Sequence, residues 1–283
     1  MVSSQTRKCD FCIYNNPRER TMKAGFCLHG TWVLERPELL KALDEVGCDG
    51  VEIWQQAFEA AGLEGVAKKI ESYSFEVAAL NPYMDFTTSE ESFNESVKLA
   101  EKFLAYASAL DCKRVRTFTS KMGSFKTSDE AKPVHWERAI KGIQTVADMA
   151  AEKDILCVME VHYGDGQLYD TSEATLRILE GVDRKNVIVN LQPPLRGEDP
   201  LDSARRLGPY VQHLHAHNWI GGWGKFTYLD SEDGDVDFPK YLNILRSHGF
   251  DGYISIEHAS YRDTIEIARH EIPYLKKLIA ART

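Results

Sequence analysis

Three histidines with a spacing of two form the most distinctive pattern in the sequence. The segment VQHLHAHN (211–218) carries His213, His215 and His217, in a chain that has nine histidines in all. Alternate side chains of a β-strand leave from the same face, so the three imidazoles would share one face. Grouped imidazoles can bind a divalent metal ion or carry protons. A lone histidine in an apolar strand is more often a hydrogen-bonded core residue, and we expect His213, the deepest of the three, to be core or to support the site.

Two carboxylates and an amide end three further β-rich segments. Glu160 lies near the end of ILCVMEVH, Gln192 ends NVIVNLQ, and Glu257 lies near the end of GYISIEH. If these side chains meet His215, the two buried carboxylates would repel each other, and a divalent cation would remove that repulsion. Carboxylate oxygens with one imidazole suit Mn²⁺, Mg²⁺, Co²⁺ or Zn²⁺. We therefore predict a divalent metal site on Glu160, His215 and Glu257.

Further polar and aromatic residues follow the predicted strand ends and are candidates for substrate contacts. His162 would hold a substrate hydroxyl, and His217 would either contact substrate or lie on an exposed rim. Aromatic faces suit the C–H faces of sugars, although packing within loops is the alternative. The GGWGK stretch (221–225) lacks the spacing of a phosphate-binding loop, and we expect it to act as a mobile lid. The predicted substrate contacts are His162, His217, Trp54, Trp219, Trp223 and Lys225.

The elements that must position these residues alternate regularly along the chain. Short β-rich runs are separated by helical patterns such as RPELLKALDEV and HWERAIKGIQTVADMAAEK. Strict alternation predicts parallel strands with crossover helices, and eight such units predict a single-domain (β/α)8 TIM barrel. Active sites of such barrels form at the carboxyl ends of the strands, where the residues above lie. The predicted strands are 22–29, 50–54, 75–81, 114–119, 155–162, 186–192, 211–217 and 252–258.

Two local features bear on this fold. A doubly wound sheet would also alternate, but its G-x-G-x-x-G turn does not follow the first strand here. The segments EVGCDGVEIW (45–54) and SHGFDGYISI (247–256) share G-x-D-G before a strand. The first glycine suits a left-handed end of a helix, and the Asp-Gly suits a tight turn into the strand.

Composition excludes several classes of protein. The chain of 283 residues has a net charge of −9 and 43% hydrophobic residues, and its lysines and arginines are not clustered. These values predict no nucleic-acid partner and no membrane partner. The six cysteines lie mostly in apolar patterns, which predicts buried free thiols and a reducing cytoplasmic location, and the first residues lack the apolar core of a secretory signal. We expect residues 1–21 to form an N-terminal extension and residues 22–283 to form the barrel.

Three longer motifs resemble those of a known family. MEVHYGD (159–165), HLHAHN (213–218) and DGDVDFPKYLNILRSHGFDGYISIEH (233–258) resemble segments of the xylose isomerase-like TIM barrels, often called sugar phosphate isomerases/epimerases. The resemblance covers roughly residues 22–280. It implies a small-molecule carbohydrate substrate and a homo-oligomer, either a dimer or a tetramer.

The resemblance also implies roles for individual residues. Members of the family hold a divalent metal with Glu, Asp, His and Glu from strands five to eight. Glu160, His215 and Glu257 match the first, third and fourth ligands, and the two glutamates would be the catalytic acid and base. Strand six departs from the pattern: NLQPPL stands where relatives often read Asn-Tyr-Asp-Pro-Ser-His, so Gln192 replaces the aspartate and Leu195 a substrate-binding histidine. Gln192 would ligate the metal through its carbonyl oxygen but would bring no charge.

These observations predict an enzyme that abstracts a proton next to a carbonyl and forms an enediolate. Reprotonation of the enediolate would make it a sugar isomerase or epimerase, whereas loss of a β-leaving group would make it a lyase or dehydratase. A non-catalytic barrel or partner subunit is a further alternative, given Gln192. Endonuclease IV shares this barrel, but it needs more zinc ligands and a basic groove, neither of which the sequence offers.

Overall fold

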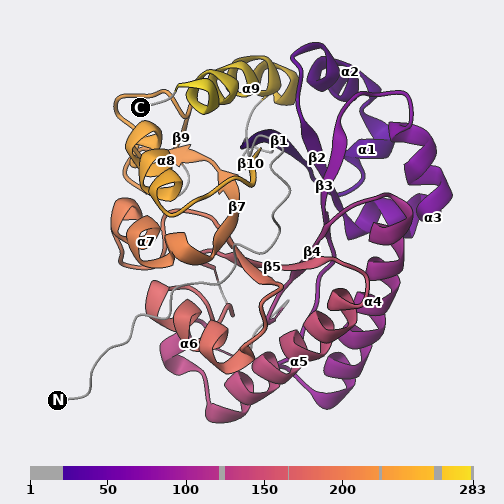
Figure 1. The fold of residues 1–283 in the computed structure, drawn as a ribbon, viewed down its shortest axis with the longest axis vertical. Coiled ribbons are helices and arrows are strands. Elements are labelled where there is room, and N and C mark those ends of the chain that lie inside the picture. The colour runs from indigo at the N-terminus through magenta and orange to yellow at the C-terminus, as the bar shows by residue number, and fades with distance from the viewer. Residues whose placement is uncertain (1–21, 121–124, 165, 223–224, 258–262, 282–283) are drawn as a thin grey trace.

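Eight parallel strands close into a barrel that is surrounded by helices in the computed structural model (Figure 1). The structure describes residues 22–120, 125–164, 166–222, 225–257 and 263–281, so the expected extension 1–21 lies outside the described residues. The strands pair in the order β1-β10-β7-β6-β5-β4-β3-β2, which confirms the predicted (β/α)8 barrel. Their bounds are β1 Lys23–Leu28, β2 Gly50–Trp54, β3 Glu76–Asn81, β4 Arg114–Thr117, β5 Leu156–Val161, β6 Val187–Leu191, β7 Val211–Ala216 and β10 Tyr253–Ile256.

Helices follow the strands and form the outer layer of the barrel (Figure 1). Several begin at a side chain that caps the first turn: Asp199, Asp237 and Asp263 each accept hydrogen bonds from backbone N–H groups of the helix that follows. The α-helices are α1 Trp32–Glu35, α2 Pro37–Glu45, α3 Gln55–Ile70, α4 Glu90–Ala109, α5 Pro133–Ala151, α6 Ser172–Val182, α7 Pro200–Leu207, α8 Phe238–Ser247 and α9 Thr264–Ala280. Two short 3₁₀ helices, η1 Ser128–Glu130 and η2 Gly208–Tyr210, complete the layer.

Strand parity separates an apolar layer from a polar barrel interior. In β7, Leu214 and Ala216 belong to the buried hydrophobic core, whereas His213 and His215 contact Glu52 of β2 across the barrel. The same alternation places apolar side chains of each strand against the helices. The predicted shared face of the histidines is therefore an interior face for His213 and His215.

The repeated G-x-D-G turns have the predicted conformation. Gly47 follows α2 with φ of 70° and Gly249 follows α8 with φ of 86°, both in the left-handed region. Glycine is favoured at such positions because a Cβ atom would strain the backbone. Each turn ends a helix at a fixed point and thereby sets where the next strand, β2 or β10, begins.

The segment after β7 is an ordered hairpin over its described residues. Strands β8 Asn218–Trp219 and β9 Phe226–Thr227 pair in antiparallel fashion. Asp235 accepts hydrogen bonds from the backbone N–H groups of Gly221 and Gly222 at 2.8 and 2.7 Å. The expected mobility of 221–225 stays a prediction, because residues 223–224 lie outside the described part of the chain.

Buried free thiols are found where the sequence predicts them. Cys27, Cys48, Cys112 and Cys157 are buried and form no disulfide among the described residues, which exclude Cys9 and Cys12. No helix in the described ranges combines the length and the apolar character that a bilayer crossing requires. The cytoplasmic location stays an expectation.

Candidate metal and active site

Glu160, His215 and Glu257 meet at the carboxyl-terminal end of the barrel strands. His215 Nδ1 lies 3.2 Å from Glu160 Oε1 and 3.3 Å from Glu257 Oε2. One possible ligand atom from each of the three residues lies within 4.8 Å of the other two. Glu160 and His215 are buried, whereas the Glu257 side chain is 10% exposed. The structure thus brings together the three predicted ligands, and their role as ligands stays a prediction.

Gln192, the fourth predicted ligand, lies on the Glu257 side of this group. Its Nε2 atom donates a hydrogen bond to Glu257 Oε2 and lies 3.5 Å from His217 Nδ1. The oxygen and nitrogen of an amide are alike in shape, so a half-turn of the amide would bring Oε1 to the same place. Gln192 can therefore offer a neutral oxygen to an ion beside Glu257.

Arg116, which the sequence analysis did not single out, holds Glu160 from the other side. It extends from β4 and is 2% exposed, and its Nη1 donates to Glu160 Oε2 at 2.7 Å. Its other N–H groups donate to the carbonyl oxygens of Asn81 and Pro82 at 3.3 to 3.4 Å. The guanidinium lies 4.6 Å from the centroid of the Tyr83 ring. Because its donors are used within the protein, Arg116 fixes Glu160 rather than presenting a charge to solvent.

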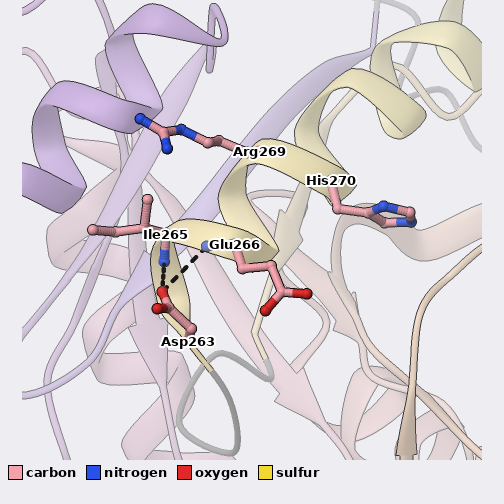
Figure 2. Close-up of a pocket in the computed structure, with 5 residues that line it drawn as sticks. All are labelled: Asp263, Ile265, Glu266, Arg269 and His270. Atoms are coloured by element: carbon pink, nitrogen blue, oxygen red, sulfur yellow. Dashed lines mark hydrogen bonds between the residues drawn. The ribbon is translucent and has the colours of Figure 1, made fainter.

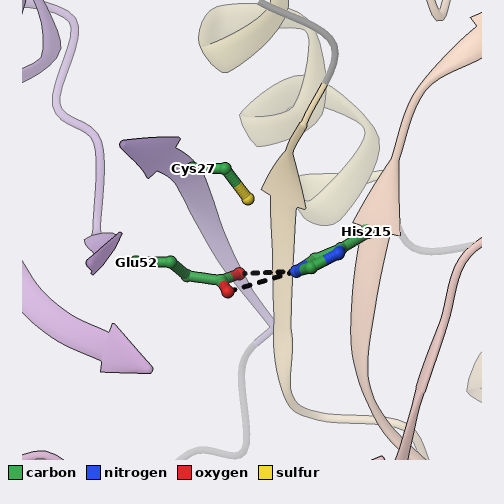
Figure 3. Close-up of side chains that lie close together, drawn as sticks. All are labelled: Cys27, Glu52 and His215. Carbon is green, nitrogen blue, oxygen red and sulfur yellow. Dashed lines mark hydrogen bonds and ion pairs between the residues drawn. The ribbon is translucent and has the colours of Figure 1, made fainter. Parts of the chain in front are cut away.

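A second network of polar side chains lies on the Nε2 side of His215, deeper in the barrel (Figure 3). Glu52 accepts hydrogen bonds from His215 Nε2 at 3.2 and 3.1 Å and from His213 Nε2 at 2.7 Å. Asn81 Nδ2 donates to Glu52 Oε2 at 2.8 Å. The thiol of Cys27, on β1, lies beside the same atoms. These residues are fully buried, so the network is closed to solvent.

His215 lies between Glu52 on one side and Glu160 and Glu257 on the other, so its protonation depends on both groups. Burial alone would lower the pKa of His215, but Glu257 and Glu52 hold it well above its ordinary value, so the imidazole is protonated in the metal-free protein. Burial alone would raise the pKa of Glu52, but His215 and then His213 hold it well below its ordinary value. A buried carboxylate in this setting stays ionised because its neighbours donate to it.

The charge balance fits a divalent cation. Burial opposes the ionisation of Glu160 and Glu257, but Arg116 lowers the pKa of the first and His215 lowers that of both. The carboxylates of Glu52, Glu160 and Glu257 are matched by one guanidinium, so two negative charges remain when His215 is neutral. A proton on His215 balances one of them, whereas a divalent ion would balance both. Two carboxylates with an imidazole are also ligands that such ions accept.

Trp54 is buried, and its ring lies 6.5 Å from that of His215. The Trp54 ring packs 4.4 Å from that of His29, and its Nε1 donates to Tyr83 Oη at 3.0 Å. The half-buried His162 ring stands edge-on to Phe118, with centroids 5.9 Å apart. Their contact with a substrate stays a prediction.

His217 and Trp219 lie in the interior. His217 is 2% exposed, its Nε2 donates to the Pro193 carbonyl oxygen at 2.6 Å, and burial lowers its pKa to about 4. The Trp219 ring is also buried and lies 5.5 Å from that of His217. The alternative that placed His217 on an exposed rim is therefore wrong, because its ring is buried against Pro193 and Trp219. A substrate contact by either residue stays a prediction.

Lys225 directly precedes β9 of the hairpin that follows β7. Lys225 is exposed, and its backbone oxygen accepts a hydrogen bond from Ile220 N at 2.9 Å. Trp223 lies outside the described residues. Neither predicted substrate contact is tested by the structure.

A surface pocket lies away from these converging side chains, on the first turns of α9 (Figure 2). Asp263, Ile265, Glu266, Arg269 and His270 line it. The carboxylate of Asp263 accepts from the backbone N–H groups of Ile265 and Glu266 at 2.8 and 3.2 Å, so it caps the helix. The pocket is explained by the start of a helix, and none of the predicted site residues lines it.

Two charged residues of the site were missed by reasoning from strand ends. Glu52 lies in the middle of the apolar strand GVEIW, and Arg116 lies between Val115 and Thr117 in RVRT. A charge at such a position must point toward a polar interior, because its neighbours on either side face the helices. Glu52 also has the parity of Trp54, which was a predicted site residue. That parity was the signal that could have found it.

Comparison with known proteins decides the family. The model of the family described as xylose isomerase-like TIM barrel matches residues 40–278. The chain belongs to this family. Membership in the xylose isomerase-like TIM barrels confirms the resemblance inferred from the motifs of strands five, seven and eight.

Relatives of this xylose isomerase-like barrel include enzymes with different reactions. A 3-dehydroshikimate dehydratase of Bacillus anthracis is 26% identical over 185 residues, which cover 62% of this chain and 63% of the relative. The chain thus spans less than two thirds of that relative's length. A D-allulose 3-epimerase structure from Methylomonas sp. has a TM-score of 0.74 at 16% identity, covering 91% of this chain and 98% of that one.

Another solved structure of this fold contains a metal ion. A xylose isomerase-like TIM barrel protein from Mycobacterium smegmatis, in complex with magnesium, has a TM-score of 0.73 at 14% identity, covering 92% of this chain and 96% of that one. At such identities the likeness to the two solved structures shows the fold alone.

Proposed function

We propose that the chain is a metal-dependent isomerase or epimerase that removes a proton from carbon next to a carbonyl in a sugar or polyol-like substrate. The observation that carries the proposal is the convergence of Glu160, His215 and Glu257, with ligand atoms within 4.8 Å of one another, at the strand ends. Membership in the xylose isomerase-like TIM barrel family, and a fold shared with a D-allulose 3-epimerase, support it.

Glu160, His215 and Glu257 would hold the divalent ion, with Gln192 as a neutral fourth ligand. When bound, the ion would polarise the substrate carbonyl and stabilise the negative charge of the enediolate. Trp54 would pack against the carbon skeleton of the substrate, beside His215.

The two glutamates would divide the proton transfers. Glu257 is the better candidate for the base, because its side chain is 10% exposed and Arg116 does not hold it. Glu160 would return the proton on the opposite face or to the next atom. His162, half-buried after β5, would bind a substrate hydroxyl.

Elimination of water from the same enediolate is a second candidate, and one observation favours it. Arg116 lies 2.7 Å from Glu160 and keeps this carboxyl ionised, which makes it a poor proton donor to carbon. A dehydratase does not return the proton to carbon, because the proton removed from carbon leaves with the hydroxyl group as water. The Bacillus anthracis relative is named a dehydratase, which is consistent with this alternative.

A substrate panel in D₂O tests the proposal and separates its two forms. The Mn²⁺-loaded protein would be incubated with keto sugars, 3-keto sugars and inososes. Isomerisation or epimerisation places deuterium on carbon and yields a new epimer by NMR, whereas elimination yields an unsaturated product with new ultraviolet absorbance. Glu160→Gln and Glu257→Gln should each lower turnover by about 10³-fold or more, as expected for a lost acid or base.

The matched control is Glu76→Gln. Glu76 starts β3 at the other end of the barrel, where it pairs with Lys23 at 2.6 Å. This variant should keep wild-type turnover. Full activity in either site variant would remove the proposed role of that glutamate.

A further inference from the structure

We propose that Glu52 is a positioning residue that fixes the imidazole of His215, with the proton on Nε2 and the lone pair of Nδ1 turned toward the metal site. The inference rests on the proposed function, because it assigns the support of a proposed ligand.

The two nitrogens of His215 face different partners. Nε2 lies 3.2 and 3.1 Å from the two oxygens of Glu52. Figure 3 draws both contacts as dashed lines. Nδ1, on the other side of the ring, lies 3.2 Å from Glu160 and 3.3 Å from Glu257. An ionised carboxylate can only accept, so Nε2 must carry a proton, and in the neutral ring Nδ1 is then the atom that can bind a metal.

Glu52 is itself held in place. His213 Nε2 and Asn81 Nδ2 approach its carboxylate at 2.7 and 2.8 Å, one on each oxygen. Among the described residues His213 Nδ1 has no hydrogen-bond partner, so the bond to Glu52 is the main polar contact of that ring. Glu52 is 1% exposed, and turning it away would leave three buried donors unsatisfied.

The same atoms do not favour a second metal ion. Ligand atoms of Cys27, Glu52 and His215 also lie within 4.8 Å of one another. Both oxygens of Glu52 already receive hydrogen bonds from His213 and Asn81, however, and Cys27, Glu52 and His215 are all fully buried. The geometry is that of a support for the metal ligand, a carboxylate behind a histidine.

Manganese affinity with a paired NMR readout tests the assignment. Free Mn²⁺ would be measured by electron paramagnetic resonance for the wild type, Glu52→Gln, Glu52→Asp and the control Glu76→Gln. Loss of a carboxylate behind a metal-binding histidine costs about 10- to 100-fold in affinity. We expect that loss in Glu52→Gln, a smaller loss in Glu52→Asp, and none in Glu76→Gln.

The NMR readout separates positioning from general damage to the fold. In ¹⁵N-histidine protein saturated with diamagnetic Mg²⁺, His215 should show a protonated Nε2 with a downfield proton that is lost or shifted in Glu52→Gln. If Glu52→Gln fails to fold, the Mn²⁺ affinity of Glu52→Asp and the tautomer of His215 in the wild type still test the inference.

Two results would overturn the inference: wild-type Mn²⁺ affinity in Glu52→Gln, or a proton on Nδ1 of His215 in the Mg²⁺-bound wild type. A wild type that binds neither ion would instead overturn the proposed function, and the role of Glu52 with it.

Discussion

The two sides of His215 carry the same kinds of groups but differ in how well they are satisfied. On the Nε2 side, the carboxylate of Glu52 receives hydrogen bonds from His213, His215 and Asn81. On the Nδ1 side, the carboxylates of Glu160 and Glu257 both approach a single ring nitrogen, which has one proton to give. The deeper side has one carboxylate with three donors, whereas the outer side has two carboxylates that share one ring nitrogen and have Arg116 and Gln192 as their further donors.

This difference shows how one barrel can hold both a support and a reactive site. The deeper network is sealed, so its geometry cannot relax toward solvent. The outer group lies at the strand ends and includes the partly exposed Glu257, so an ion or substrate could reach it. Burial with complete hydrogen bonding favours rigidity, and burial with excess charge favours ligand binding.

On the outer side, removing Arg116 should have the largest effect on the free energy of unfolding. Arg116→Met leaves Glu160 buried without its guanidinium, and breaking a buried ion pair costs about 3–5 kcal/mol. Urea unfolding of the metal-free protein measures the free energy of unfolding. The double variant with Glu160→Gln should recover most of the loss, because it removes the uncompensated charge.

An exposed ion pair provides the control for Arg116. Arg184 lies 2.5 Å from Asp148, and its side chain is 38% exposed. Arg184→Met should cost less than about 1 kcal/mol. Equal stability of the two arginine variants would contradict a role for Arg116 as the counter-charge of Glu160.

The protonation of His215 predicts how metal-free stability depends on pH. Glu257 and Glu52 raise the pKa of His215 in the folded protein above its unfolded value of about 6.5. The contribution of His215 to the free energy of unfolding is therefore complete below about pH 6.5 and is lost as the pH rises through the folded pKa. The melting temperature of the metal-free protein should therefore fall above about pH 6.5. Saturating Mn²⁺, which replaces the proton, should stabilise the protein more at pH 8 than at pH 6 by roughly 1–2 kcal/mol.

Thermal unfolding between pH 6 and pH 9, with and without Mn²⁺, measures both effects. His270→Gln changes an exposed histidine on α9 and should leave the pH profile unchanged. A stabilisation by Mn²⁺ that is the same at both pH values would contradict the exchange of a proton for the ion.

A carboxylate at position 192 should increase the metal affinity of the outer side, with a smaller effect than the changes above. Gln192→Asp places a third carboxylate beside Glu257, where Gln192 now donates a hydrogen bond. We expect Mn²⁺ to bind about tenfold more tightly, which corresponds to about 1.4 kcal/mol. Asn94→Asp, on the exposed face of α4, adds the same charge elsewhere and should not change the affinity. Unchanged or weaker binding by Gln192→Asp would place Gln192 outside the ligand set.

Much of the fold could be predicted because its signals are local. Short β-rich runs, helical periods and the glycines at 47 and 249 are each set by a few neighbouring residues, and the barrel follows from their alternation. Parity within single strands was enough to bring Glu160, His215 and Glu257 together as candidates.

The remainder depends on contacts between distant strands. Glu52 reaches His213 and His215 only because β1 joins β10 and β10 joins β7, so that β2 faces β7 across the closed barrel. His217 is buried between Pro193, whose carbonyl oxygen accepts from its Nε2, and the Trp219 ring, and the contact with Pro193 cannot be seen in the sequence near position 217. Neither feature can be derived from the spacing of residues within one segment.

The most direct test of a metal site on the Nδ1 side is anomalous diffraction from crystals grown with Mn²⁺. We predict a single strong peak among Glu160, His215 Nδ1 and Glu257, at metal–ligand distances of about 2.0–2.3 Å. The absence of that peak, or a peak on the Nε2 side between Cys27 and Glu52, would contradict it.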